Sequence, residues 1–332
     1  MLVWLPELFC TNLLSGYLPE IIELCSMPTV KHYLSLVKFS HTIFALPFAL
    51  IGFFLAMSQM PAGYLQKYFL FKTEPGWATS DVITSPYLLF VLVLICMVSA
   101  RSAAMAFNRY LDRQFDAKNP RTAIREIPSG IISANSALLF TMINCVIFIV
   151  TTWFLNFICF VLSPVALFVI LFYSYTKRFT PLCHLVLGLG LSLAPIGAYL
   201  AVMGSFALLP VLFSFVVLCW VSGFDIIFAL QDEAFDRQEG LKSIPVALGT
   251  ARALLVSRLL HAAAALLVII AGWCGAFGVF YWIGVGVFIT MLIYQHSIVK
   301  PGDLRRVNIA FMTANGIASV VFALFVIADL FM

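Results

Sequence analysis

Charge is scarce in this sequence. Asp, Glu, Lys and Arg together make up 10% of its 332 residues, whereas soluble globular domains carry about 25%. Hydrophobic residues make up 63%, and the mean hydropathy is +1.05. A chain so poor in charge cannot cover the surface of a soluble domain with polar groups. The composition therefore excludes that class and predicts an integral membrane protein embedded in a lipid bilayer.

The sequence also lacks the patterns by which cysteine and histidine hold soft metals. Its eight cysteines stand apart from one another, with no Cys-x-x-Cys pair, and no histidines lie at ligand spacing. We therefore interpret most of the cysteines as small apolar residues within a helical bundle. His41 and His184, at the ends of apolar segments, are interpreted as interfacial residues without a role.

Long apolar segments recur along the chain, and a membrane-spanning helix needs about 20 such residues. We predict an all-α, polytopic membrane bundle of nine transmembrane helices, forming one domain over residues 31–332. Residues 1–30 are predicted to be an N-terminal extension, with Met27 as an alternative start. The predicted spans are residues 41–57, 86–112, 131–152, 157–174, 183–203, 208–231, 250–273, 276–297 and 307–331.

Lys and Arg gather in the loops on one side of the predicted membrane. Only Lys67 and Lys72 fall on the opposite side, between the first two spans. Because positively charged loops face the cytoplasm, we predict a cytoplasmic N-terminus in a bacterial inner (plasma) membrane. The formal net charge of +4 reflects this bias, so we predict no nucleic-acid partner.

Polar residues interrupt two of the apolar segments at helical spacing. Positions i, i+7 and i+11 of an α-helix fall within about 40° of one another, so residues at this spacing share one face. The first such stripe is Arg101, Asn108 and Asp112, flanked by Asp116, and the second is Asp225, Asp232 and Asp236. A carboxylate at the bilayer centre costs roughly 2.5 to 3.5 kcal/mol. Five clustered carboxylates therefore predict a bound cation, at the cytoplasmic ends of these spans.

The ligand types favour Mg²⁺ as that cation, because they are all oxygen donors. The candidate metal ligands are Asn108, Asp112, Asp116, Asp232 and Asp236. Magnesium usually keeps water and bridges a few carboxylates to substrate phosphates. The candidate phosphate-binding bases in the neighbouring loops are Arg121, Arg125, Lys177, Arg178 and Lys242. Together these residues predict a diphosphate site at the membrane surface.

Two function classes are compatible with intramembrane acids: an enzyme of this kind and an ion-coupled transporter. A transporter would usually show inverted repeats with Gly or Pro breaks in corresponding spans. The spans that contain Pro47, Pro164 and Pro195 show no such pairing, and this favours the enzyme.

At these residues the chain resembles the UbiA-type intramembrane prenyltransferases. Residues 108–116 resemble their first Asp-rich motif, and residues 225–240 resemble their second. The similarity extends from about residue 31 to the end, through Asn119-Pro-Arg-Thr122, Arg125-Glu-Ile-Pro-Ser-Gly130, Tyr173-x3-Lys177 and Lys242-Ser-Ile-Pro245. Glu126 stands where many members have proline. The family's bundle has nine helices, in agreement with the span count.

The resemblance implies Mg²⁺-dependent transfer of a polyprenyl group from its diphosphate to an aromatic acceptor. Asp112 and Asp232 would act in catalysis as metal ligands, and Lys177 would neutralise charge on the leaving diphosphate. Tyr173 would contact substrate. Asp225 would accept the phenolic proton of the acceptor. No obligate protein partner is predicted.

Arg101 indicates that the acceptor is an acid, because a guanidinium can bind a carboxylate through two hydrogen bonds. The 4-hydroxybenzoate members of the family are similar in placing an arginine here. Prenylation of 4-hydroxybenzoate, in quinone biosynthesis (ubiquinone or menaquinone), is the first expectation. A dihydroxynaphthoate carboxylic acid for menaquinone is the alternative, and the sequence leaves both open.

Overall fold

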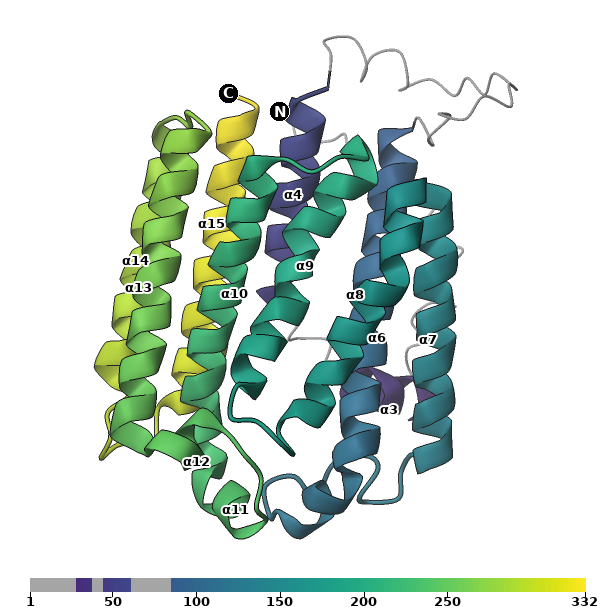
Figure 1. The fold of residues 1–332 in the computed structure, drawn as a ribbon, viewed down its shortest axis with the longest axis vertical. Coiled ribbons are helices and arrows are strands. Elements are labelled where there is room, and N and C mark those ends of the chain that lie inside the picture. The colour runs from purple at the N-terminus through teal and green to yellow at the C-terminus, as the bar shows by residue number, and fades with distance from the viewer. Residues whose placement is uncertain (1–27, 38–43, 61–84) are drawn as a thin grey trace, which may run out of the picture.

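The computed structural model describes residues 28–37, 44–60 and 85–332. In Figure 1 the long helices stand side by side in a bundle, and the short helices α3, α11 and α12 lie at one end of it. Within the described residues no strand forms beyond an isolated bridge between Lys300 and Asp303. The all-α class predicted from the sequence is confirmed.

The elements follow one another along the chain with short connections. They are α3 (Pro28–Leu36), α4 (Leu46–Ser58), α6 (Pro86–Lys118), α7 (Ala134–Leu155), α8 (Phe157–Thr176), α9 (Cys183–Met203), α10 (Leu208–Ala229), the 3-10 turn η2 (Leu230–Asp232), α11 (Glu233–Gln238), α12 (Ile244–Leu248), α13 (Thr250–Cys274), α14 (Val279–Ile298), the π-helix η3 (Ile309–Ala314) and α15 (Asn315–Leu330).

Eight helices in the described part of the chain are long and apolar enough to cross a membrane. The multi-pass membrane character is therefore confirmed. Helix α4, with 13 residues, is shorter than the roughly 20 that a span needs. The first three residues of the span predicted at residues 41–57 lie outside the described residues. The count of nine and the side of the N-terminus stay predictions.

Asn156 separates α7 from α8 and also ties them to α9. Its side-chain oxygen accepts a hydrogen bond from the backbone N–H of Cys159 at 2.9 Å, which caps the start of α8. Its amide nitrogen donates to the carbonyl of Leu200 at 2.7 Å. Asn156 thus caps the first turn of α8 and connects it to the last turn of α9.

The core of the bundle is aromatic, and a buried polar connection runs from Trp220 to η3. Trp220 is fully buried and packs against Phe48 and Phe288. Its indole N–H donates to the side-chain oxygen of Asn315 at 2.9 Å. The Asn315 amide in turn donates to the carbonyls of Ala310 and Phe311. These carbonyls belong to the π-helix η3, where backbone hydrogen bonding is irregular.

Helices α4 and α9 approach so closely at Gly52 that no side chain fits. A Cβ placed on Gly52 would lie 2.0 Å from the carbonyl oxygen of Pro195. We expect Gly52→Ala to destabilise the protein by about 1 to 3 kcal/mol, as overpacking of a core does. Gly286→Ala is the control, because a Cβ there meets nothing within 4 Å. The thermal midpoint of the detergent-purified protein should fall for Gly52→Ala only; equal midpoints would contradict this contact.

Candidate functional site

A polar cavity of about 280 Å³ lies among α6, α8, α9, α10 and the loops at their ends. It brings together the two acidic motifs, which are more than 100 residues apart in the chain. The predicted site residues that line it are Arg101, Asn108, Asp112, Asp116, Arg121, Arg125, Tyr173, Lys177, Asp225, Asp232 and Asp236. Arg178 lies beside it, paired with Asp112. The side chain of Lys242 is exposed and does not line this cavity.

The first motif lies on one uninterrupted helix. Helix α6 runs for 33 residues through the whole motif, so Arg101, Asn108 and Asp112 keep the common face expected of their spacing. The side-chain amide of Asn108 donates to Asp112 Oδ2 at 3.0 Å. Asp116, one turn further, is buried with 6% of its surface exposed. The oxygen ligands of this motif therefore point into one confined space.

The second motif does not lie on one continuous helix, in contrast to the expectation that Asp225, Asp232 and Asp236 share one helical face. Helix α10 ends at Ala229, and the tighter 3-10 turn η2 follows. Asp232 has φ −104° and ψ 3°, outside the α-helical range, before α11 begins at Glu233. The seven-residue spacing from Asp225 to Asp232 is thus not that of a continuous α-helix. Asp225, Asp232 and Asp236 nevertheless all line the cavity.

Each acid of the two motifs, Asp225 apart, lies beside a base from a neighbouring loop or helix end. The pairs are Arg178–Asp112 at 3.1 Å, Arg125–Asp116 at 2.6 Å, Arg121–Asp232 at 2.5 Å and Lys177–Asp236 at 2.7 Å. Because the positive charges of these bases offset the negative charges of the acids, a dense cluster of carboxylates is stable at the end of an apolar bundle. The same bases stand ready for the oxygens of an anionic ligand.

Lys177, just beyond the end of α8, stays protonated. Burial acts to lower the pKa of its ammonium group, but the carboxylate of Asp236 outweighs that effect and the pKa is raised above its usual value. A raised pKa keeps the group cationic throughout the neutral range, since its proton is lost only at a higher pH. Lys177 is therefore a permanent positive charge at the cavity.

Two carboxylate oxygens in the cavity lack partners. Asp116 Oδ2 and Asp236 Oδ2 are buried and accept no hydrogen bond from any described residue. Arg109 Nη1 lies 3.9 Å from Asp116 Oδ2, too far for a hydrogen bond. An unpaired buried carboxylate oxygen is costly, and a divalent cation bound at each motif would satisfy it. The donors thus fit Mg²⁺.

The cavity does not supply a complete set of protein ligands. Among the described residues, no group of three or more His, Cys, Asp and Glu side chains converges as a metal site. This agrees with the habit of Mg²⁺, which takes one or two carboxylates and completes its shell with water and substrate phosphates.

Sequence reasoning missed three residues of this cavity. Asn119 connects the motifs, because its amide donates to Asp232 Oδ1 at 3.3 Å and its oxygen accepts from the backbone N–H of Arg121 at 3.0 Å. Arg109 is buried beside Asp116. His184, interpreted from the sequence as an interfacial residue without a role, is instead buried, and its Nδ1 lies 2.6 Å from Asp225 Oδ2. Asn119 belongs to the motif Asn119-Pro-Arg-Thr122, whereas nothing in the sequence connects His184 with Asp225.

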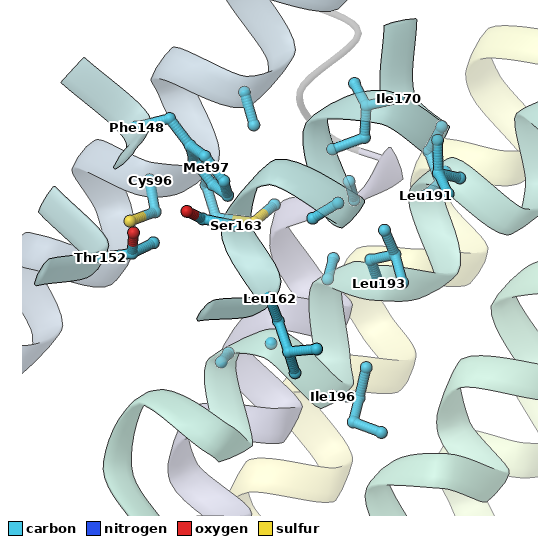
Figure 2. A pocket seen from close by; sticks show the side chains of 18 of the residues that line it. Cys96, Met97, Phe148, Thr152, Leu162, Ser163, Ile170, Leu191, Leu193 and Ile196 are labelled. Carbon is cyan, nitrogen blue, oxygen red and sulfur yellow. The ribbon is translucent and has the colours of Figure 1, made fainter. Parts of the chain in front are cut away.

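A second, apolar cavity of about 410 Å³ continues from the polar one. Figure 2 shows side chains around it that include Met97, Phe148, Leu162 and Ile196. It lies among α6, α7, α8 and α9 and reaches Phe206, beyond the end of α9. The residues that line both cavities are Arg101, Met105, Tyr173, Leu187 and Leu191. A molecule can therefore have a polar end in one cavity and an apolar chain in the other.

The hydroxyls of Thr152 and Ser163, which line the apolar cavity, are turned to their own helices. Thr152 Oγ1 donates to the carbonyl of Ile149 at 2.7 Å, and Ser163 Oγ donates to that of Phe160 at 2.8 Å. With these donors engaged, the wall offers chiefly hydrocarbon surface. Such a cavity suits an apolar chain and little else.

Arg101 stands at the junction of the two cavities. Its Nε is buried without a hydrogen-bond partner in the part of the chain that the structure describes, and it forms none of the ion pairs of the cavity. A buried cation without an acid is expensive. The geometry leaves this guanidinium available for an anionic group that enters between the two cavities.

Comparison with known proteins places the chain among membrane enzymes. Residues 73–317 match the UbiA prenyltransferase family. The 4-hydroxybenzoate octaprenyltransferase of Tolumonas auensis is 32% identical over 247 residues, covering 74% of this chain and 86% of that protein. The protein of the same name from Cronobacter sakazakii is 30% identical over 246 residues, covering 74% and 84%.

Solved structures have the same fold. A UbiA homolog from Aeropyrum pernix K1 is 30% identical with a TM-score of 0.72, covering 87% of this chain and 98% of that one. A UbiA homolog from Archaeoglobus fulgidus, solved with GPP and Mg²⁺ bound, is 19% identical with a TM-score of 0.65, covering 91% and 100%. The second similarity supports the fold alone.

Proposed function

Because this chain belongs to the UbiA prenyltransferase family, we propose that it transfers a polyprenyl group from a polyprenyl diphosphate to a ring carbon of a hydroxylated aromatic acid. The observation that carries the proposal is the continuity of two cavities of opposite character. One is lined by acids and bases, and the other by hydrocarbon. A polyprenyl diphosphate has the same two parts.

The diphosphate binds in the polar cavity. Asp112, Asp116, Asp232 and Asp236, with the Asn108 amide oxygen, are the residues that would hold Mg²⁺. When bound, Mg²⁺ offsets the negative charge that the diphosphate gains as it leaves. The bases paired with these acids, which are Arg121, Arg125, Lys177 and Arg178, contact the remaining phosphate oxygens. A UbiA homolog with the same fold was solved with GPP and Mg²⁺ bound.

The bond changes take place at the junction of the cavities. The allylic C–O bond breaks with its electron pair going to the diphosphate, and a ring carbon ortho to the phenolic oxygen forms the new C–C bond. Asp225 accepts the phenolic proton, and the proton lost from that ring carbon returns to the phenolic oxygen as aromaticity is restored. The apolar and aromatic surroundings exclude water, which would otherwise capture the allylic cation. Tyr173, which lines both cavities, contacts the substrates there.

The acceptor is a carboxylic acid held by Arg101. The relatives named 4-hydroxybenzoate octaprenyltransferase make 4-hydroxybenzoate the first choice, with a dihydroxynaphthoate acid as the alternative. Both would place the enzyme in quinone biosynthesis. The surplus of basic loops on one side supports a plasma membrane location with the polar cavity facing the cytoplasm.

Replacing Arg101 should raise the KM for the aromatic acid and leave the KM for the polyprenyl diphosphate nearly unchanged. We expect Arg101→Leu to raise the KM for 4-hydroxybenzoate by at least thirtyfold, since loss of one partner of a buried charge pair costs about 2 to 5 kcal/mol. The KM for the polyprenyl diphosphate should change by less than about twofold, because Arg101 forms none of the ion pairs of the acidic motifs. Steady-state kinetics with each substrate varied in turn gives both values.

Phenol, which lacks the carboxylate, is the matched control for this variant. Wild-type protein should prefer 4-hydroxybenzoate over phenol, and Arg101→Leu should abolish most of that preference. If the variant instead loses affinity for the diphosphate or Mg²⁺ and keeps its preference for the acid, Arg101 serves the acidic motifs and not the acceptor.

Product analysis tests the proposed reaction and chooses the acceptor. Purified protein receives Mg²⁺, a polyprenyl diphosphate and an equal mixture of 4-hydroxybenzoate and 1,4-dihydroxy-2-naphthoate, and mass spectrometry identifies the prenylated product. We expect prenyl-4-hydroxybenzoate to dominate. Prenylated naphthoate as the main product would support the alternative acid, and no prenylated acid would reject the reaction.

A further inference from the structure

His184 is the neighbour that determines how Asp225 is presented to the cavity. It lies in the first turn of α9, with 3% of its surface exposed. Its Nδ1 is 2.6 Å from Oδ2 of Asp225 on α10. Its other ring nitrogen, Nε2, is 3.4 Å from the backbone nitrogen of Ile244 at the start of α12. The imidazole is therefore fixed at both nitrogens.

These two contacts define which nitrogen of His184 carries the proton. The backbone N–H of Ile244 can only donate, so Nε2 must accept and carry a lone pair. The proton of the neutral ring then lies on Nδ1 and points at the Asp225 carboxylate.

The backbone of Ile244 is itself held in place. The N–H of Lys242 donates to the carbonyl of Lys177 at 2.7 Å. Ser243 caps the start of α12 by accepting from the N–H of Val246. The donor to His184 Nε2 thus belongs to a segment anchored on both sides, so the tautomer of His184 does not depend on a mobile group.

Close packing of α9 on α10 fixes the distance between His184 and Asp225. Gly188 lies one turn after His184, and Ser222 lies one turn before Asp225. A Cβ on Gly188 would lie 2.3 Å from Ser222 Oγ and 2.6 Å from the carbonyl oxygen of Leu218. The absence of a side chain at Gly188 lets the helices touch there, and this brings His184 within hydrogen-bond distance of Asp225.

Asp225 keeps its second oxygen free. Its side chain is 22% exposed, and both Asp225 and His184 line the polar cavity. Oδ2 accepts from His184, whereas no described residue donates to Oδ1. Rotation of a carboxylate about χ2 has a low barrier. The hydrogen bond to Oδ2 therefore restrains this rotation and fixes the direction in which Oδ1 points.

We infer that His184 is a positioning residue for Asp225: its Nδ1–H holds Oδ2 so that Oδ1 faces the hydroxyl of the aromatic acceptor. The inference rests on the proposed function, in which Asp225 takes the phenolic proton. His184 contacts neither substrate and exchanges no proton with them. Its contribution is to keep the base in the one orientation in which transfer occurs.

Gln and Met replacements of His184 separate positioning from packing. A glutamine amide can donate to Asp225 and accept from Ile244, as the imidazole does, whereas methionine has a similar size and no donor. We expect His184→Met to lower kcat by about 30- to 100-fold while changing the KM for the polyprenyl diphosphate by less than twofold. His184→Gln should retain at least one third of the wild-type kcat. Equal losses in the two variants would overturn the inference.

A double-mutant comparison of His184 with Asp225 tests the inference by a second, independent measurement of kcat. In an Asp225→Asn background, adding His184→Met should lower kcat by no more than about twofold, because both changes disable the same base. A full 30-fold further loss would show that His184 acts elsewhere and overturn the inference. If His184→Met does not fold, His184→Leu replaces it in both experiments, and the thermal midpoint of each variant establishes folding.

The outcomes also separate this inference from the proposed function. A wild-type protein that forms no prenylated product contradicts the proposed function itself. A wild-type protein that forms product, with His184→Met as active as His184→Gln, contradicts only the role of His184.

Discussion

Alanine at Asp112 or Asp232 is expected to lower prenyl transfer by about 1,000-fold, as removal of a main electrostatic contact to a leaving group does. Asp112 is held by Asn108 and Arg178, and Asp232 by Asn119 and Arg121. Each alanine removes a carboxylate that would bind Mg²⁺, and also removes the acid that pairs with Arg178 or Arg121. Turnover is measured at saturating Mg²⁺ and polyprenyl diphosphate.

Two comparisons make this prediction specific. Asp303→Ala should leave turnover unchanged, because Asp303 pairs with the exposed Arg305 and lines neither cavity. The double variant Asp112→Ala/Asp232→Ala should be little worse than either single one, since both residues serve one leaving group and their effects do not add. Near wild-type turnover in a folded single variant would contradict the assignment of these two motifs to a metal-bound diphosphate.

Phenylalanine at Gly197 is expected to shorten the prenyl chain that the enzyme accepts. Gly197 lines the apolar cavity, and a Cβ built on it meets no atom within 4 Å. It lies six residues beyond Leu191, which lines both cavities, and this corresponds to about 9 Å along α9. An extended isoprene unit spans about 5 Å, judged from ordinary carbon–carbon bond lengths. A ring at Gly197 would thus leave room for about two units.

The expected result is a change in chain-length preference and not a general loss. We expect Gly197→Phe to lower kcat/KM for an eight-unit diphosphate by about 100-fold, since overpacking and lost burial of several units each cost a few kcal/mol. For a two-unit diphosphate the change should stay within about threefold. Gly286→Phe is the control, because Gly286 also meets no atom within 4 Å but lies outside both cavities. Equal losses for long and short chains would contradict this use of the apolar cavity.

The first motif could be predicted from the sequence because its geometry is local. Helix α6 is continuous, so helical spacing alone places Asn108 and Asp112 on one face. The all-α membrane fold was equally accessible, since long apolar segments have few other stable structures in a bilayer.

The second motif was less predictable because distant residues shape it. The 3-10 turn at Leu230–Asp232 coincides with the contacts that Asn119 and Arg121 make to Asp232. Those contacts come from a loop more than 100 residues earlier, and helical spacing carries no information about them. His184 was missed for the same reason, since its partner Asp225 is 41 residues away.

The apolar cavity could not be located from the sequence either. Residues that face lipid and residues that face the cavity are of the same type, because both surroundings are hydrocarbon. Val165 lines the cavity and is 59% exposed, while Phe168 on the same helix is 63% exposed and does not line it. Only the packing of α6, α7, α8 and α9 separates the two surfaces.

Product stoichiometry in one reaction tests most directly whether this protein is a prenyltransferase. Purified protein is incubated with a polyprenyl diphosphate and 4-hydroxybenzoate, with Mg²⁺ or with EDTA, and both inorganic diphosphate and prenylated acid are quantified. We predict one diphosphate released for each acid prenylated, with both products abolished by EDTA. A folded protein that consumes neither substrate, yet moves protons or cations across the membrane of reconstituted vesicles, would contradict the enzyme and support a transporter.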